Sequence, residues 1–145
     1  MSAPKKNAGC AHMIDASRMI PLLVEASPAF AGTWEEFQAE YADDPPIPYY
    51  IALGSFARHL CDLLATDDHA TLRRVFTVVE RLHLEGDSFV QEAATVGLLE
   101  DLQNANMHRP GTSPDRFEPF LLPESARWWK KLRGFWREGR PLADD

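Results

Sequence analysis

Apolar side chains recur along this chain at steps of three and four residues, the spacing of one face of an α-helix. The stretch YYIALGSFARHLCDLLATDD, residues 49–68, carries such a stripe at Leu53, Phe56, Ala57, Leu60, Cys61 and Leu64. The stretch DDHATLRRVFTVVERLHLEGD, residues 67–87, carries another at Leu72, Val75, Phe76, Val79 and Leu82. Asp68 can cap the second helix, and Gly86 suits the left-handed position that often follows a helix. The pattern predicts two long amphipathic helices.

The next segment, EGDSFVQEAATVGLLEDLQN, has apolar side chains on most of its circumference and charges near its two ends. A helix of that kind is packed on several sides. Asp87 or Ser88 can cap its start. Its small residues Ala93, Ala94 and Gly97 let a neighbouring helix come close. We therefore expect this helix at the centre of a bundle, antiparallel to the helix before it.

Shorter helical patterns flank these three helices. Asp15 or Ser17 can cap a short helix near the start, and Thr33 and Glu36 have the spacing of a capping box. The stretch PDRFEPFLL predicts a short helix, and PESARWWKKLRGFWREG predicts the last one, with Pro123 near its start. We expect a disordered tail over residues 1–13 and a single all-α domain over 14–140, a bundle of six or seven helices.

Charge is unevenly distributed in the 145 residues, whose formal net charge is -7. Up to Met107 the chain has 16 acidic and 7 basic residues, and from His108 onward it has 6 acidic and 8 basic residues. An acidic body repels phosphates, which argues against nucleic acid as the main partner. It attracts basic proteins, although mild acidity can also serve only to keep a protein soluble.

The cysteines and the distribution of apolar residues indicate the cellular compartment of the protein. Cys10 and Cys61 are not expected to form a disulfide, which favours a reducing compartment. The N-terminal residues contain no apolar core of a signal peptide. No run approaches the roughly 18 apolar residues that a membrane span needs. We therefore expect a cytoplasmic protein without membrane contact.

Residues that could carry catalysis or bind a metal are scattered. No two histidines have the i, i+4 spacing of a metal motif, and there is no cysteine pair. His59 lies two residues from Cys61, and on a helix such side chains point away from each other. A phosphate-binding glycine loop is also missing. We expect no cofactor, no metal, no catalytic residues and no enzymatic activity.

The last predicted helix combines aromatic and basic residues. One face carries Trp128, Trp129, Leu132, Phe135 and Trp136, and the rest of the surface carries Arg127, Lys130, Lys131, Arg133 and Arg137. This pattern is compatible with a platform for single-stranded nucleic acid or with a membrane-surface helix. The simpler interpretation, which we favour, is an aromatic core face with a solvated basic face that pairs with the acidic body.

Acidic residues give the remaining functional signal, in two groups. The first surrounds the end of the second helix, at Glu35, Glu36, Glu40, Asp43 and Asp44. The second decorates the two later helices, at Glu80, Glu85, Asp87, Glu92, Glu100 and Asp101. Most of these positions are on predicted solvent-facing helix surfaces. They are compatible with an ordinary solvated surface, and the leading functional interpretation is a binding surface for a basic protein.

Two resemblances extend this interpretation. The stretch DSFVQEAATVGLLEDL resembles the second helix of a HEAT-type repeat, through Asp87, Val90, Ala93, Ala94 and Leu98, which implies a HEAT-like antiparallel helix pair at the centre of the fold. Residues 18–138 resemble small, acidic, all-helical bacterial immunity proteins that neutralise polymorphic toxins. The stretches that carry this resemblance are YYIALGSFARHLCDLL, VFTVVERLHLEGD, VQEAATVGLLEDLQN and PESARWWKKLRGFW.

The second resemblance implies a stoichiometric inhibitor that occludes a cognate toxin or effector in the cytoplasm. Both acidic groups would then contact a basic toxin. The alternative from another class is a non-catalytic helical scaffold or regulatory adaptor for a different cytoplasmic protein.

Overall fold

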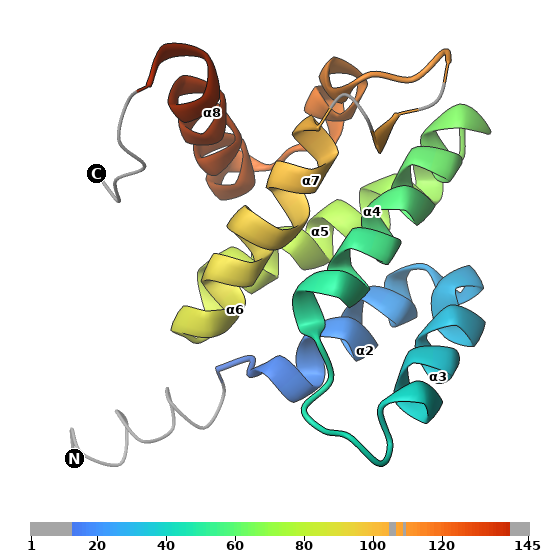
Figure 1. The fold of residues 1–145 in the computed structure, drawn as a ribbon. Coiled ribbons are helices and arrows are strands. Elements are labelled where there is room, and N and C mark those ends of the chain that lie inside the picture. Colours follow the sequence, from blue (N-terminus) through green and yellow to red (C-terminus); the bar gives the residue numbers. More distant parts are fainter. Residues whose placement is uncertain (1–12, 105–106, 109, 140–145) are drawn as a thin grey trace, which may run out of the picture.

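A computed structural model describes residues 13–104, 107–108 and 110–139 of the chain (Figure 1). Over these residues the protein is all-helical, with seven α-helices in one compact domain and no strand beyond an isolated bridge. Most of the predicted tail, and residue 140, lie outside the described residues. The helices outside the centre are α2 (Ala16–Ala26), α3 (Ala31–Glu40) and α8 (Pro123–Glu138), with short 3₁₀ turns η1 (Pro28–Phe30) and η4 (Pro114–Phe120).

The centre of the domain consists of the three long helices expected there. They are α4 (Tyr49–Ala65), α5 (His69–Glu85) and the continuous helix formed by α6 (Ser88–Glu92), η2 (Ala93–Leu99) and α7 (Glu100–Gln103). Consecutive members run antiparallel (Figure 1). The segment η2 is π-helical, which the sequence pattern did not predict. The last central helix therefore changes its winding where it is most deeply packed.

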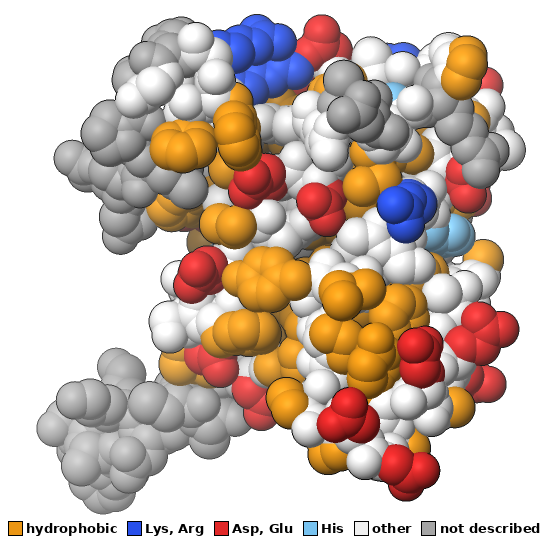
Figure 2. Space-filling model, in the orientation of Figure 1, with side chains coloured by type: hydrophobic (Ala, Val, Ile, Leu, Met, Phe, Trp, Pro, Cys, Tyr) orange, Lys and Arg blue, Asp and Glu red, His pale blue; other side chains and the backbone are white. Residues whose placement is uncertain are grey.

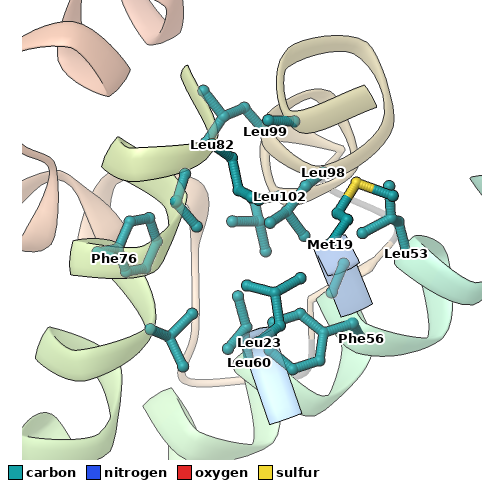
Figure 3. Close-up of a cluster of buried hydrophobic side chains, with 14 of the residues drawn as sticks. Met19, Leu23, Leu53, Phe56, Leu60, Phe76, Leu82, Leu98, Leu99 and Leu102 are labelled. Carbon is teal, nitrogen blue, oxygen red and sulfur yellow. The ribbon is translucent and has the colours of Figure 1, made fainter. Parts of the chain in front are cut away.

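The core confirms both predicted apolar stripes, because every member of each stripe is buried. Figure 3 shows side chains from α2, α4, α5 and the last central helix meeting in one cluster. Its labelled members are Met19, Leu23, Leu53, Phe56, Leu60, Phe76, Leu82, Leu98, Leu99 and Leu102. Burial of this apolar surface provides the main stabilisation of the fold.

Gly97 explains how closely α4 and η2 pack. A Cβ atom at this position would lie 2.9 Å from Cδ1 of Tyr50 and 3.1 Å from Cδ1 of Leu53. At Gly54, one turn further along α4, a Cβ atom would meet a carboxylate oxygen of Asp101 at 3.4 Å. The contacts advance in the same direction along both helices, so α4 runs parallel to the last central helix. The prediction that a small residue permits close approach is confirmed at Gly97.

Helix caps are partly as predicted. The carboxylates of Asp15, Asp68 and Asp87 each accept a backbone N–H at the start of their helix. The left-handed conformation predicted for Gly86 is wrong: its φ is -75° and its ψ is 154°, an extended conformation that carries the chain directly into the next helix. The predicted capping box at Thr33 is also wrong, because α3 begins earlier and continues directly from η1.

The chain before α2 is attached to the turn between α5 and α6. Ile14 is buried, and its N–H donates to the carbonyl of Glu85 at 2.9 Å. Its carbonyl accepts the N–H of Asp87, also at 2.9 Å. These two bonds form the isolated bridge with Gly86. They hold the extended turn in place from a distant part of the sequence.

Helix α8 packs against α5 and the last central helix. Trp129 and Leu132 are buried as predicted, but Phe135 and Trp136 are 42% and 60% exposed. The expectation that all the aromatic residues form a core face is therefore wrong for the last turn of α8. Among the helices of the described residues, none is long and apolar enough to cross a membrane.

Candidate partner-binding face

Three of the predicted partner-binding acids have structural roles inside the protein. The carboxylate of Glu80 accepts the backbone N–H groups of Glu124 and Ser125 at 2.8 and 2.9 Å, and so caps the start of α8. Asp87 caps α6 by accepting the N–H of Val90 at 2.9 Å. Glu85 forms an ion pair with Arg81 on the same helix, at 3.2 Å. These acids are less available to a partner than their predicted exposure implied.

The acids on the last central helix are placed differently. Glu92 is exposed, and Glu100 and Asp101 are half-buried. Within the described part of the chain none of the three takes part in an ion pair. Burial raises the pKa of both Glu100 and Asp101. The neighbouring Asp101 charge raises the pKa of Glu100 further, while the Arg58 guanidinium partly offsets the effect on Asp101.

The acids of the other predicted group are exposed on α3 and the loop after it, at Glu35, Glu36, Glu40, Asp43 and Asp44. Figure 1 places α3 on the opposite side of α4 from α7. Helix α4 therefore lies between these acids and the α7 acids Glu100 and Asp101.

Aromatic side chains accompany the acids of the last central helix. Phe89 makes edge-on contacts with Tyr49 and Tyr50, with ring centroids 6.1 Å apart in both cases. Tyr50 and Phe89 are 40% and 39% exposed. Glu92 lies one turn beyond Phe89 on α6. Partial burial raises the pKa of Tyr50, and the charge of Glu92 raises it further. We call Tyr50, Phe89 and Glu92 the aromatic–acidic patch.

A groove of about 480 Å³ lies between the ends of α7 and α8. It is lined by Glu100, Asp101, Gln103, Asn104, Pro114, Arg133, Trp136 and Arg137. We call it the α7–α8 groove. In Figure 2 hydrophobic side chains gather where α4 begins beside α6, a second group lies over the end of α8, and acidic side chains lie between them. Hydrophobic and acidic side chains of these elements therefore lie together on one face of the molecule.

A second cavity, of about 580 Å³, borders η2 and α8. His83 and Thr95 at its wall are buried and hydrogen-bonded to each other at 2.9 Å. The second ring nitrogen of His83 lies 3.0 Å from the carbonyl oxygen of Val79. Burial lowers the pKa of His83, an effect that outweighs the nearby carboxylates of Glu80 and Glu124. This histidine joins α5 to the π-helical segment.

The fold also forms two side-chain pairs that sequence spacing could not reveal. The hydroxyl of Ser27 lies 2.7 Å from Nε2 of His59, and Sγ of Cys61 lies 3.9 Å from Nδ1 of His108. Ser27 and Cys61 are only 1% and 2% exposed. Both pairs resemble nucleophile–base pairs in composition, but the burial of Ser27 and Cys61 separates them from solvent in this structure.

Two basic residues of α8 form ion pairs with acidic residues of the C-terminal part of the chain. Arg127 pairs with Glu124 at 2.8 Å, and Arg133 pairs with Asp115 and with Glu118. These ion pairs join α8 to its own first turn and to η4. Among the described residues, no group of three or more histidine, cysteine or acidic side chains could hold a metal ion.

The fold and the face define a small all-helical domain with exposed aromatic and acidic side chains on one side. The model of a family described as a domain of unknown function (DUF7674) matches residues 20–137, so the chain belongs to that family. No curated protein and no solved structure matches the chain.

Proposed function

We propose that this protein is an immunity protein that binds a basic toxin or effector in the cytoplasm and neutralises it by occlusion. The observation that carries the proposal is the aromatic–acidic patch. Exposed apolar groups rimmed by polar residues often mark protein interfaces, and tyrosine is enriched among the residues that contribute most to binding. Carboxylates beside such aromatic groups favour a basic partner and accelerate the encounter.

The internal roles of Glu80, Glu85 and Asp87 narrow the proposed contact surface. It consists of the aromatic–acidic patch with Glu100 and Asp101, and the acids of α3 can contribute a second contact. An interface of ordinary size covers about 800 Å² of each partner. A partner held in this way loses access to the part of its own surface that it would use on a substrate.

Affinity purification of the tagged protein from its native cells, followed by mass spectrometry, tests the proposal. We expect one stoichiometric protein partner that is toxic when expressed alone and harmless when co-expressed with this chain. A partner that is bound but not toxic would replace neutralisation by the adaptor function. Failure to recover any stoichiometric partner would contradict both.

Two double variants then test whether the aromatic–acidic patch is the surface that binds the partner. Phe89→Ser with Glu92→Lys changes the aromatic–acidic patch and should weaken partner binding at least tenfold. Leu84→Ser with Glu25→Lys makes the same kinds of change at exposed positions outside the patch, and should leave binding unchanged. Equal affinity of the two double variants would exclude this face as the binding surface.

A further inference from the structure

We propose that the α7–α8 groove is the docking site for an arginine or lysine side chain on a basic segment of the partner protein. This inference rests on the proposed function, because it names the chemistry that the partner must bring to the face. Three features support it: the size of the groove, the charges on its walls, and the exposed ring of Trp136.

The groove is large enough for one long side chain and has a defined shape. Its volume of about 480 Å³ lies within the range of about 300–1,000 Å³ that is usual for ligand-binding pockets. Gln103 fixes the two walls relative to each other, because its amide donates to the carbonyl of Trp129 on α8 at 2.8 Å. An entering side chain therefore meets a site that is already formed.

Charge complementarity identifies the occupant. Two arginines also line the groove. Arg133 is engaged by Asp115 and Glu118, and Arg137 forms no ion pair among the described residues. The wall on α7 presents adjacent half-buried carboxylates without an ion pair among the described residues. Their mutual repulsion and partial desolvation favour the entry of a cation, because an opposite charge stabilises their ionised forms.

Trp136 supplies an aromatic surface for the same cation. Elsewhere on α8 the indole rings already have cationic neighbours: Arg127 and Lys131 lie 4.9 and 5.0 Å from the ring centre of Trp128. Within the described part of the chain, Trp136 has only Phe135 as an aromatic or cationic ring neighbour. A guanidinium or ammonium group placed over an exposed tryptophan gains a cation–π interaction in addition to the carboxylates.

Nuclear magnetic resonance with small cationic probes tests the site before any partner is known. The probe is Nα-acetyl-arginine amide, and its neutral isostere Nα-acetyl-citrulline amide is the control. We expect a saturable shift of the Trp136 indole N–H resonance, identified by its loss in Trp136→Phe, with the arginine probe and not with the citrulline probe. Absence of a shift, or equal shifts with both probes, would overturn the proposal.

Matched charge variants show whether the arginine probe responds to the groove carboxylates themselves or only to the net charge of the protein. Glu100→Gln with Asp101→Asn should weaken binding of the arginine probe at least fivefold. Glu25→Gln with Glu85→Gln removes the same formal charge from exposed positions outside the proposed contact surface, and should leave binding of the arginine probe unchanged. Equal weakening by both pairs would overturn the site. The groove variant should remain folded, because burial raises the pKa of both carboxyls and neutral amides relieve that unfavourable charge.

The same variants separate this inference from the proposed function. If the purified partner binds the groove variant as tightly as the wild type while the Phe89→Ser, Glu92→Lys variant fails, the groove inference is wrong and the proposed function stands. If the arginine probe binds but no protein partner is recovered, the groove is a site for a free organic cation and the proposed partner segment is wrong. If the groove variant binds the partner more weakly than the wild type does, the result supports both the groove inference and the proposed function.

Discussion

Glu80 offers a sharp test of how α8 is attached to the central helices. Its carboxylate accepts two backbone N–H groups at the first turn of α8, and one of them belongs to the fully buried Ser125. Replacing Glu80 by Ala leaves both donors without this acceptor. Hydrogen bonds to charged groups contribute roughly 1.5–3 kcal/mol each, whereas loss of a helix N-cap side chain costs about 0.5–2 kcal/mol.

Because Glu80 is only half-buried and water can replace part of the contact, we expect a loss of about 2–3 kcal/mol in the free energy of unfolding. At roughly 2–4 °C for each kcal/mol in a domain of similar size, the melting temperature should fall by about 5–10 °C. Glu80→Gln retains a neutral acceptor and should lose about half as much. Urea denaturation and thermal melting measured by circular dichroism give both quantities.

Glu85→Ala is the matched control for Glu80→Ala. It removes a carboxylate from the same helix, but this one is exposed and forms only an i, i+4 pair with Arg81. Such pairs contribute about 0.3–0.5 kcal/mol. If Glu80→Ala is no more destabilising than Glu85→Ala, the two capping bonds do not stabilise the packing of α8, and the reasoning is refuted.

Three further predictions concern the central helices. Gly97→Ala should destabilise the protein by about 1–3 kcal/mol because the new methyl group overpacks against Tyr50. The control Gly32→Ala, whose methyl group meets no atom within 4 Å, should gain up to about 1 kcal/mol of stability from helix propensity. If urea denaturation shows Gly32→Ala to be the less stable variant, the close packing at Gly97 is contradicted. Burial lowers the pKa of His83, so the unfolded chain binds the proton more readily and the free energy of unfolding should fall as the pH drops below about 6.5. His83→Gln should flatten this pH dependence of stability between pH 7.5 and 5.5. An unchanged slope in the variant would contradict the role of His83. Asp87→Ala should cost about 1 kcal/mol by removing the cap of α6 and Asp87→Asn much less, and thermal melts showing equal losses would argue against capping.

Much of the fold could be predicted from the sequence because it depends on local periodicity. The buried stripes of α4 and α5 and the caps at Asp68 and Asp87 involve residues only a few positions apart. The π-helical winding of η2 could not be predicted, since it is set by what packs around the helix. The extended conformation of Gly86 has a similar origin, because the bridge to Ile14 holds this turn.

The candidate site was predicted less completely than the fold. Exposure of an acid could be expected from helical periodicity, but the use of Glu80 by α8 depends on residues 44 and 45 positions away. The exposure of Trp136 depends on where the packing of α8 ends, which no spacing rule encodes. For the same reason, the pairing of Ser27 with His59, 32 positions apart, left no sequence signal.

The bridge at Ile14 has a consequence for the order in which the domain assembles. The hairpin of α5 and α6 is closed by neighbouring residues, so it can form early, as local contacts generally do. The bonds from Ile14 to Glu85 and Asp87 close a much longer loop, and therefore bear a larger entropic cost. The turn between α5 and α6, which leads into Phe89, should become rigid only after α2 and the preceding Ile14 have packed against it. In hydrogen exchange, the amides of Ile14 and Asp87 should then open together, as one cooperative unit.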